Sequence, residues 1–187
     1  MLFALGFKIE TFLTIQELPK NYIIVANHTS MLDILFQFLL VNEPFLFIGK
    51  KELTRFPLFG FFYSKTNILV DRSSMKSRRQ AFDVASKRLD NGINVCIYPE
   101  GGVPEHDIRL GPFKDGAFKL AVDKNLPILI VVFPDNKKAL PYKTFEGGPM
   151  RLRASVLPLI YPKGKSVSDL KSEVREIISN ELTKYGI

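Results

Sequence analysis

The chain has 187 residues, of which 46% are hydrophobic and 24% are charged, a composition typical of a globular protein rather than a disordered one. This length fits a single domain with a sizeable core. The single cysteine, Cys96, excludes an internal disulfide and suits a reducing compartment. With only two histidines, the chain lacks the residues for a zinc site built from His and Cys, and no metal is expected.

The net charge of +7 is concentrated in one segment. Residues 50–88 carry ten Lys/Arg and three Asp/Glu, whereas residues 1–49 carry two and four, and residues 89–187 carry fourteen and twelve. A basic segment of this kind suits partners that carry phosphate, whether nucleic acid, anionic lipid or a small molecule. A solvated helix face is the alternative explanation for most of the individual lysines.

The predicted elements alternate between strands and helices along the chain. The apolar stretch 22–26 is the first expected strand, and a helix is expected over 31–41. Further strands are expected at 45–50, 67–72, 93–100 and 126–134, and further helices at 73–91, 113–125 and 167–185. The proline-rich stretch 135–165 predicts irregular strands at a sheet edge. This alternation predicts an α/β fold in a single domain, residues 1–187, with a mixed, largely parallel central sheet flanked by helices.

Two stretches suit contact with a membrane surface. The opening MLFALGF is too short to span a bilayer and lacks the basic flank of a signal peptide, so residues 1–20 are interpreted as a membrane-contacting segment. Residues 56–63 combine five aromatic side chains with nearby lysine and arginine, as interfacial segments do. An ordinary buried helix, interrupted at Pro57 and Gly60, is the alternative for this second stretch.

Residues 27–33 read NHTSMLD and place a histidine and an aspartate at a strand-to-helix junction. Ser30 and Asp33 have the form of a capping box, which explains both residues without a catalytic role. A capping box does not explain His28. Residues five apart on one helix point about 140° away from each other, so His28 and Asp33 pair only if His28 lies in the turn and Asp33 on the helix. The predicted elements place them in that way.

Polar residues follow two other predicted strands as well. Asp71 and Arg72 end the strand at 67–72, and Glu100 ends the strand at 93–100. Because ligand crevices in open α/β sheets lie beyond the carboxyl ends of the strands, the active site is expected there.

The order of these motifs resembles the glycerophospholipid acyltransferases, most closely the 1-acylglycerol-3-phosphate O-acyltransferases (lysophosphatidic acid acyltransferases). The stretch NHTSMLD matches the NHxxxxD motif, Arg72 the second motif, Glu100-Gly101 the third and Pro127 the fourth. The third motif departs from the family's Glu-Gly-Thr-Arg, because Gly102 and Val103 follow Glu100-Gly101. Lys114 is the expected substitute for the missing arginine, and Arg109 is less well placed. The family usually carries a hydrophobic helical segment before its first motif, and about twenty residues precede that motif's strand here.

The resemblance implies transfer of a fatty acyl group from an acyl thioester to the free hydroxyl of lysophosphatidic acid, which gives phosphatidic acid without a covalent acyl-enzyme. His28 would be the general base, and Asp33 would orient its ring. The implied substrate-binding residues are Arg72, Glu100, Gly101, Gly102 and Lys114.

Each binding residue has an expected role. Arg72 would hold the acceptor's phosphate, because its guanidinium fork matches phosphate geometry. The backbone N–H groups of Gly101 and Gly102 would stabilise the oxyanion. Glu100 would orient Arg72 or a substrate hydroxyl. The phenylalanine-rich stretch 56–63 is the expected wall of the groove for the acyl chain.

No cofactor is expected beyond the cosubstrate, an acyl-carrier-protein or coenzyme A thioester. The other expected partners are a lysophospholipid acceptor and a membrane surface, without nucleic acid, at the cytoplasmic face of the membrane as a peripheral or monotopic protein. Two alternatives stay open: another acceptor, such as glycerol 3-phosphate, an aminolipid or another lysophospholipid, and a non-catalytic protein that binds anionic lipid. A nucleotide-binding P-loop is excluded, because the Gly-Lys-Ser at 164–166 lacks the preceding glycine that the motif requires.

Overall fold

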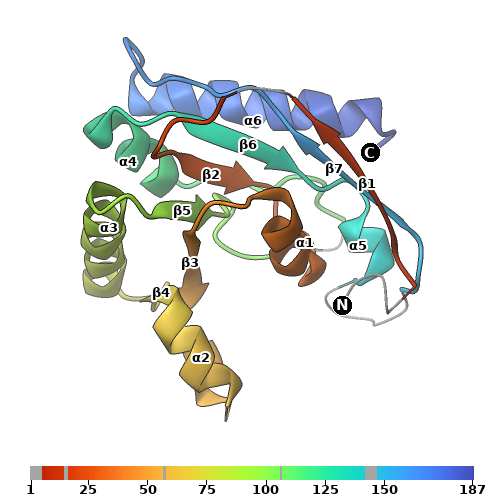
Figure 1. The fold of residues 1–187 in the computed structure, drawn as a ribbon, viewed down its shortest axis with the longest axis horizontal. Coiled ribbons are helices and arrows are strands. Elements are labelled where there is room, and N and C mark those ends of the chain that lie inside the picture. Colours follow the sequence, from red (N-terminus) through yellow and green to blue (C-terminus); the bar gives the residue numbers. More distant parts are fainter. Residues whose placement is uncertain (1–5, 15–16, 57, 106, 142–146) are drawn as a thin grey trace.

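The computed structural model describes residues 6–14, 17–56, 58–105, 107–141 and 147–187. Its described strands form one seven-stranded sheet in the order β1-β7-β6-β2-β5-β3-β4 (Figure 1). The strands are β1 (Lys8–Leu13), β2 (Ile23–Ala26), β3 (Phe45–Lys50), β4 (Asn67–Val70), β5 (Asn94–Ile97), β6 (Ile128–Val132) and β7 (Arg151–Val156). The helices are α1 (Leu32–Leu40), α2 (Phe59–Thr66), α3 (Met75–Asp90), α4 (Gly116–Lys124), α5 (Asn136–Ala139) and α6 (Val167–Lys184), with the short 3-10 helix η2 (Lys51–Arg55).

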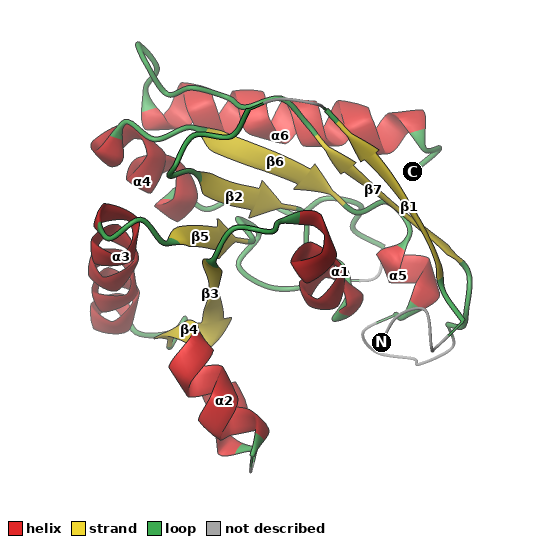
Figure 2. Ribbon diagram, viewed as in Figure 1, coloured by secondary structure: helices red, strands yellow, loops and turns green. Residues whose placement is uncertain are grey.

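The sheet is largely parallel. The five strands from β2 to β6 run in one direction, β7 pairs antiparallel with β6, and β1 pairs parallel with β7. Helices connect most of the parallel strands, as parallel pairing requires (Figure 2). The predicted fold class, an α/β domain with a mixed, largely parallel sheet, is confirmed.

Two hydrophobic cores lie on the two faces of the sheet, because successive strand residues point to opposite sides. Ile23, Val25, Val95 and Ile97 point toward α3, α4 and α6. Ile24, Ala26 and Cys96 belong to the core that α1 covers through Leu32 and Phe36. The central strands β2 and β6 are buried throughout, which is why they read as continuous apolar runs.

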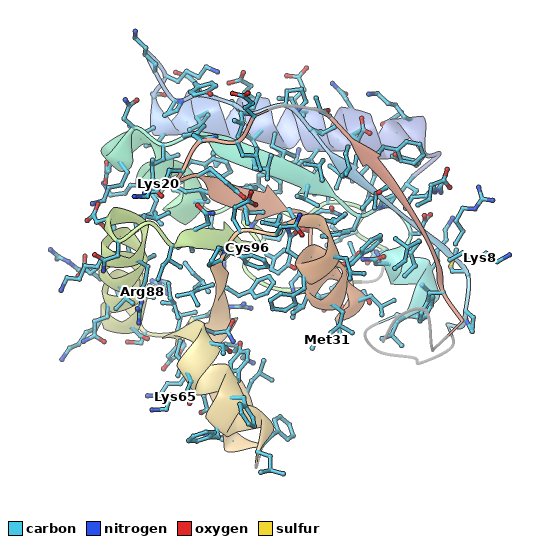
Figure 3. All side chains as sticks on the ribbon, viewed as in Figure 1. Lys8, Lys20, Met31, Lys65, Arg88 and Cys96 are labelled. Carbon is cyan, nitrogen blue, oxygen red and sulfur yellow. The ribbon has the colours of Figure 1, made fainter. Side chains whose placement is uncertain are left out.

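Cys96 is one of these buried residues. Its side chain lies at the middle of the sheet (Figure 3) and is fully buried in β5. Burial raises the pKa of the Cys96 thiol well above its usual value, so it stays a neutral core residue rather than a nucleophile.

The predicted position of the proline-rich stretch 135–165 is wrong in one respect. Its strand β7 lies inside the sheet between β6 and β1, and the edge on this side is β1, which the sequence interpretation did not predict. The prolines of the stretch lie outside the six residues of β7, so every residue of this strand keeps the backbone N–H that can bond to a neighbouring strand. β1 is mostly exposed or half-buried, and therefore lacks the apolar pattern that identifies a strand.

The two strands that carry candidate site residues end earlier than predicted. β4 ends at Val70, because Asp71 begins a turn in which its carbonyl oxygen accepts from Ser74 N (3.3 Å). β5 ends at Ile97, and Tyr98 begins the next turn. The polar residues that follow both strands therefore lie in turns at the carboxyl edge of the sheet.

The N-terminal segment that was expected to contact a membrane contributes β1 to the sheet, while residues 1–5, 15 and 16 lie outside the described part. Within the described ranges, no helix combines the length and the apolar character needed to cross a bilayer.

Candidate active site

The candidate site lies where parallel strands end. His28 follows β2 by two residues, Arg72 follows β4 by two, and Glu100 follows β5 by three. β2, β5, β3 and β4 are neighbours in the sheet and run parallel, so these turns lie along one edge. This edge is the expected position of a ligand crevice in an open α/β sheet.

His28 and Asp33 form a buried pair. His28 Nδ1 lies 2.9 Å from Asp33 Oδ2, and the Asp33 side chain is completely buried on the first turn of α1. The same oxygen accepts from Thr29 N at 2.6 Å and from Ser30 N at 2.9 Å. Because the carboxylate accepts from its neighbours, the hydrogen-bond network assigns the proton to Nδ1, which makes Nε2 of His28 the acceptor nitrogen of the neutral ring.

The other carboxylate oxygen is held from a distant part of the chain. Asn136, which is fully buried in the short helix α5, donates from Nδ2 to Asp33 Oδ1 at 2.8 Å. Asn27 similarly joins β2 to the end of β6, where its side chain bonds both N and O of Phe133 (2.8 and 2.9 Å). Sequence reasoning placed Asn27 in the first motif without a structural role, and it did not identify Asn136. The signal available was that each polar residue closely follows a buried strand.

The predicted capping box is formed in part. Asp33 accepts from Ser30 N, as the motif requires. The Ser30 hydroxyl accepts from Leu32 N at 3.2 Å instead of from Asp33 N, and it donates to the carbonyl of Leu140 at 2.7 Å. The prediction is therefore wrong for the hydroxyl, because this group also ties the turn to the chain after α5.

An aromatic stack fixes the plane of the imidazole. The rings of His28 and Tyr98 lie 4.1 Å apart at 15°, and Tyr98 in turn stacks on Phe47 at 5.9 Å and 12°. Burial raises the pKa of the Tyr98 phenol well above its usual value, so the phenol stays neutral. The ring of His28 is thus held by Asp33 at its edge and by Tyr98 on its face.

Glu100 positions the backbone around His28. Its Oε1 accepts from His28 N at 2.8 Å and its Oε2 accepts from Gly111 N at 2.7 Å. Burial raises the pKa of this carboxyl, and the two N–H groups oppose that shift. The expected role was to orient Arg72 or a substrate hydroxyl, but the structure shows both oxygens bound to the main chain.

The two predicted cations meet at the glycine turn. Gly101 has φ +74°, and a Cβ at this position would lie 2.5 Å from Lys114 Nζ, so the lysine side chain crosses the bare backbone. A Cβ at Gly102 would lie 3.1 Å from an Arg72 guanidinium nitrogen. Glycine at 101 is needed both for its backbone conformation and for this close approach.

One of the expected oxyanion donors is already used. Gly101 N donates to the Tyr98 carbonyl oxygen at 3.0 Å within the turn, which leaves Gly102 as the glycine for that role. Arg109, the alternative to Lys114, donates instead to Ser179 O and to Thr183 Oγ1 on α6.

A cleft of about 680 Å³ opens beside these cations. Arg72, Gly101 and Lys114 border it, and Tyr98 belongs both to this lining and to the stack on His28. Its apolar walls come from β3, β4, β5, α3 and α4, through Ile48, Val70, Phe82, Ile97, Ala117 and Leu120. The phenylalanine-rich stretch 56–63 was expected to form this wall, but none of the described lining residues belongs to it.

Comparisons with known proteins agree with this architecture. A family model described as Acyltransferase matches residues 11–134. A 1-acyl-sn-glycerol-3-phosphate acyltransferase of Limnanthes douglasii is 29% identical over 87% of this chain, which spans 58% of that relative's length. A protein of the same name from Helicobacter pylori is 29% identical over 87% of this chain and 69% of its own. The crystal structure of the 1-acyl-sn-glycerophosphate acyltransferase of Thermotoga maritima shares the fold, with a TM-score of 0.83, 23% identity, and coverage of 99% of this chain and 75% of that one.

The fold is that of an α/β domain whose polar groups gather at the carboxyl ends of parallel strands. Because the family model covers well over half of its residues, the chain belongs to the Acyltransferase family.

Asn136→Ala removes a hydrogen bond to a buried carboxylate, so the free energy of unfolding is expected to fall by about 1.5–3 kcal/mol. Urea unfolding measures this change. Asn180→Ala, at an exposed position of α6, is the matched control and should leave stability within about 0.5 kcal/mol of the original. Equal stability of Asn136→Ala and the unsubstituted chain would contradict the role assigned to Asn136.

Tyr98→Phe keeps the ring that stacks on His28 and removes a buried hydroxyl that no described residue reaches. The free energy of unfolding is therefore expected to stay level or to rise by about 1 kcal/mol, with acyl transfer retained. Tyr98→Leu, which loses the ring, should lower both the free energy of unfolding and the rate of acyl transfer. Destabilisation of the phenylalanine variant by more than about 1 kcal/mol would show that the hydroxyl has a partner after all.

Proposed function

We propose that the protein transfers a fatty acyl group from an acyl thioester to the hydroxyl of lysophosphatidic acid, which gives phosphatidic acid. The observation that carries the proposal is a buried His28–Asp33 pair at the sheet edge where Arg72 and Lys114 meet. A base and a cationic site for phosphate are the two groups that such an acceptor requires. The names of the relatives from Limnanthes and Helicobacter support this acceptor.

In the proposed reaction, Nε2 of His28 removes the proton of the acceptor hydroxyl as its oxygen attacks the thioester carbonyl carbon. Asp33, hydrogen-bonded to Nδ1, keeps the ring in the required tautomer and stabilises the imidazolium that forms. The carbon–sulfur bond then breaks, and the leaving thiolate takes the proton back from His28. The acyl group moves in one displacement through a tetrahedral intermediate, so no acyl-enzyme forms and no further nucleophile is needed.

Two charges need stabilisation during this reaction. Arg72 and Lys114 are proposed to hold the acceptor phosphate, since both side chains reach the glycine turn from different elements. The backbone N–H of Gly102 is the proposed donor to the oxyanion that develops on the thioester carbon. Glu100 is proposed to act indirectly, through the backbone of His28.

The apolar cleft between α3 and α4 suits the fatty chain of a substrate. Its volume of about 680 Å³ lies within the usual range for ligand pockets. Arg72 and Lys114 are among the charged residues that line it, together with Arg78, Arg79, Asp83, Asp115 and Lys119. The donor is proposed to be an acyl-carrier-protein or coenzyme A thioester, and no other cofactor is proposed. The proposed location is the cytoplasmic face of a membrane, with peripheral attachment.

His28→Ala should reduce acyl transfer to lysophosphatidic acid by about 10²-fold or more, because it removes the general base. Transfer is measured in mixed micelles with both donors, and the product is identified by mass. Ser172→Ala, exposed on α6, serves as the control variant and should retain full activity. Circular dichroism must show the alanine variant to be folded.

Equal transfer by His28→Ala and the unsubstituted chain would remove His28 from the mechanism. If the unsubstituted chain transfers nothing to lysophosphatidic acid but acylates glycerol 3-phosphate or another lysophospholipid, the acceptor is wrong and the base assignment stands.

Arg72→Gln should raise KM for lysophosphatidic acid by about tenfold or more, since a charge-assisted hydrogen bond to phosphate contributes about 1.5–3 kcal/mol. Initial rates at varied acceptor concentration measure this effect. Arg88→Gln, at an exposed position near the end of α3, is the matched control and should leave KM unchanged. An unchanged KM in Arg72→Gln would place the phosphate elsewhere.

A further inference from the structure

The segment from η2 to α2 exposes an unusual group of large apolar side chains. Phe56, Leu58, Phe61 and Phe62 are each between 60% and 80% exposed. Together these four residues are called the phenylalanine surface. We propose that the phenylalanine surface docks the protein on an anionic lipid bilayer, with its aromatic rings at the boundary between headgroups and acyl chains.

Other residues of α2 pack against β3 and η2, so the exposed rings belong to a helix that is held in place by the rest of the fold. A Cβ on Gly49 of β3 would collide with the Tyr63 ring, which shows that Tyr63 lies directly against that strand. Gly60 similarly allows α2 to approach the backbone of Thr54 in η2. While Tyr63 packs inward, the four side chains of the phenylalanine surface stay mostly exposed. The helix α2 itself projects beyond the edge strand β4 (Figures 1 and 2).

Exposed cations flank the phenylalanine surface along the chain. Lys50, Lys51, Arg55 and Lys65 are all exposed, and the only carboxylate in residues 50–66 is Glu52. Lys65 projects from α2 (Figure 3), and its Nζ lies 5.9 Å from the centroid of the Phe61 ring. This arrangement of aromatic rings among cations matches the headgroup region of an anionic bilayer, where rings enter the interface and cations meet phosphate.

A separate observation concerns another exposed aromatic ring, Phe38, and its connection with His28. Phe38 on α1 is 57% exposed, and its ring lies 5.5 Å from that of Phe47. Phe47 stacks on Tyr98, and Tyr98 stacks on His28. A line of aromatic rings therefore runs from the surface near α1 to the proposed base.

The inference deepens the proposed function and rests on it in one respect, that the acceptor is a membrane lipid. A second copy of the chain is a less suitable occupant, because four cations around one apolar patch would meet the same four across a symmetric interface. A bilayer with negative headgroups complements both the apolar and the charged parts of the surface.

The experiment is flotation of the full chain with vesicles of phosphatidylcholine alone and of phosphatidylcholine mixed with phosphatidylglycerol. The unsubstituted chain should float with the mixed vesicles, more weakly at high salt. Phe61→Ser/Phe62→Ser should weaken binding by roughly tenfold or more, through loss of buried apolar area. Tyr161→Ser, which removes a similarly exposed aromatic ring from the loop that precedes α6, should bind as the unsubstituted chain does.

The charge arm uses a matched pair of double variants. Lys51→Gln/Lys65→Gln should weaken binding to the mixed vesicles by roughly tenfold or more, whereas Lys87→Gln/Lys163→Gln removes the same charge elsewhere and should have a much smaller effect. The oligomeric state of the unsubstituted chain and of every variant is measured by size-exclusion chromatography in the absence of lipid.

Three outcomes would overturn the proposal: no flotation of the unsubstituted chain, equal flotation of the phenylalanine variant, or a dimer in solution that this variant converts to monomer. Transfer to a short-chain lysophosphatidic acid below its micellar concentration is measured alongside. Retention of that transfer without vesicle binding would reject the docking surface and leave the proposed function standing. Vesicle binding without any transfer would reject the proposed function and leave the docking surface standing.

Discussion

The buried carboxylate of Asp33 is the constraint on which the site depends. A charge-bearing group at a completely buried position needs hydrogen-bond donors around it, and here they come from three places. The turn after β2 supplies two backbone N–H groups, His28 supplies its ring, and Asn136 supplies its side chain. Satisfying this one carboxylate therefore joins β2, α1 and the segment after β6. The same contacts orient the histidine for proton transfer.

Glu100 performs a comparable function on the opposite side of the same turn. Its two oxygens hold His28 N and Gly111 N, so the backbone of the histidine and the loop before α4 are fixed together. Lys114 follows that loop and crosses Gly101. The positions of the proposed base and of one proposed phosphate ligand are thus coupled through a single buried carboxyl. Two acidic residues that do not touch the reacting atoms set the geometry of the site.

Much of this arrangement was predictable from the sequence, for identifiable reasons. The apolar runs of β2, β5 and β6 mark buried strands, and the turn after β2 can bring His28 to Asp33 only in the way observed. Asn136 was not predictable, because its partner lies 103 residues away and its helix has four residues. Pairing between distant residues leaves no local pattern. The mostly exposed strand β1 escaped prediction for the same reason, because its pairing with the distant strand β7 decides it. The hydrogen bond of Gly101 N was missed for another reason: it lies in a local turn that begins at Tyr98, within the stretch predicted as a strand.

The site also spans both sides of the sheet. His28 stacks on Tyr98, which packs with the core beneath α1, whereas Arg72 and Lys114 border the cleft between α3 and α4. The base and the cations therefore approach the carboxyl edge of the sheet from its two faces. In the proposed reaction, the spacing between His28 and the two cations has to match the distance between the hydroxyl and the phosphate of the acceptor. Acceptors in which that distance is longer or shorter are therefore expected to react more slowly.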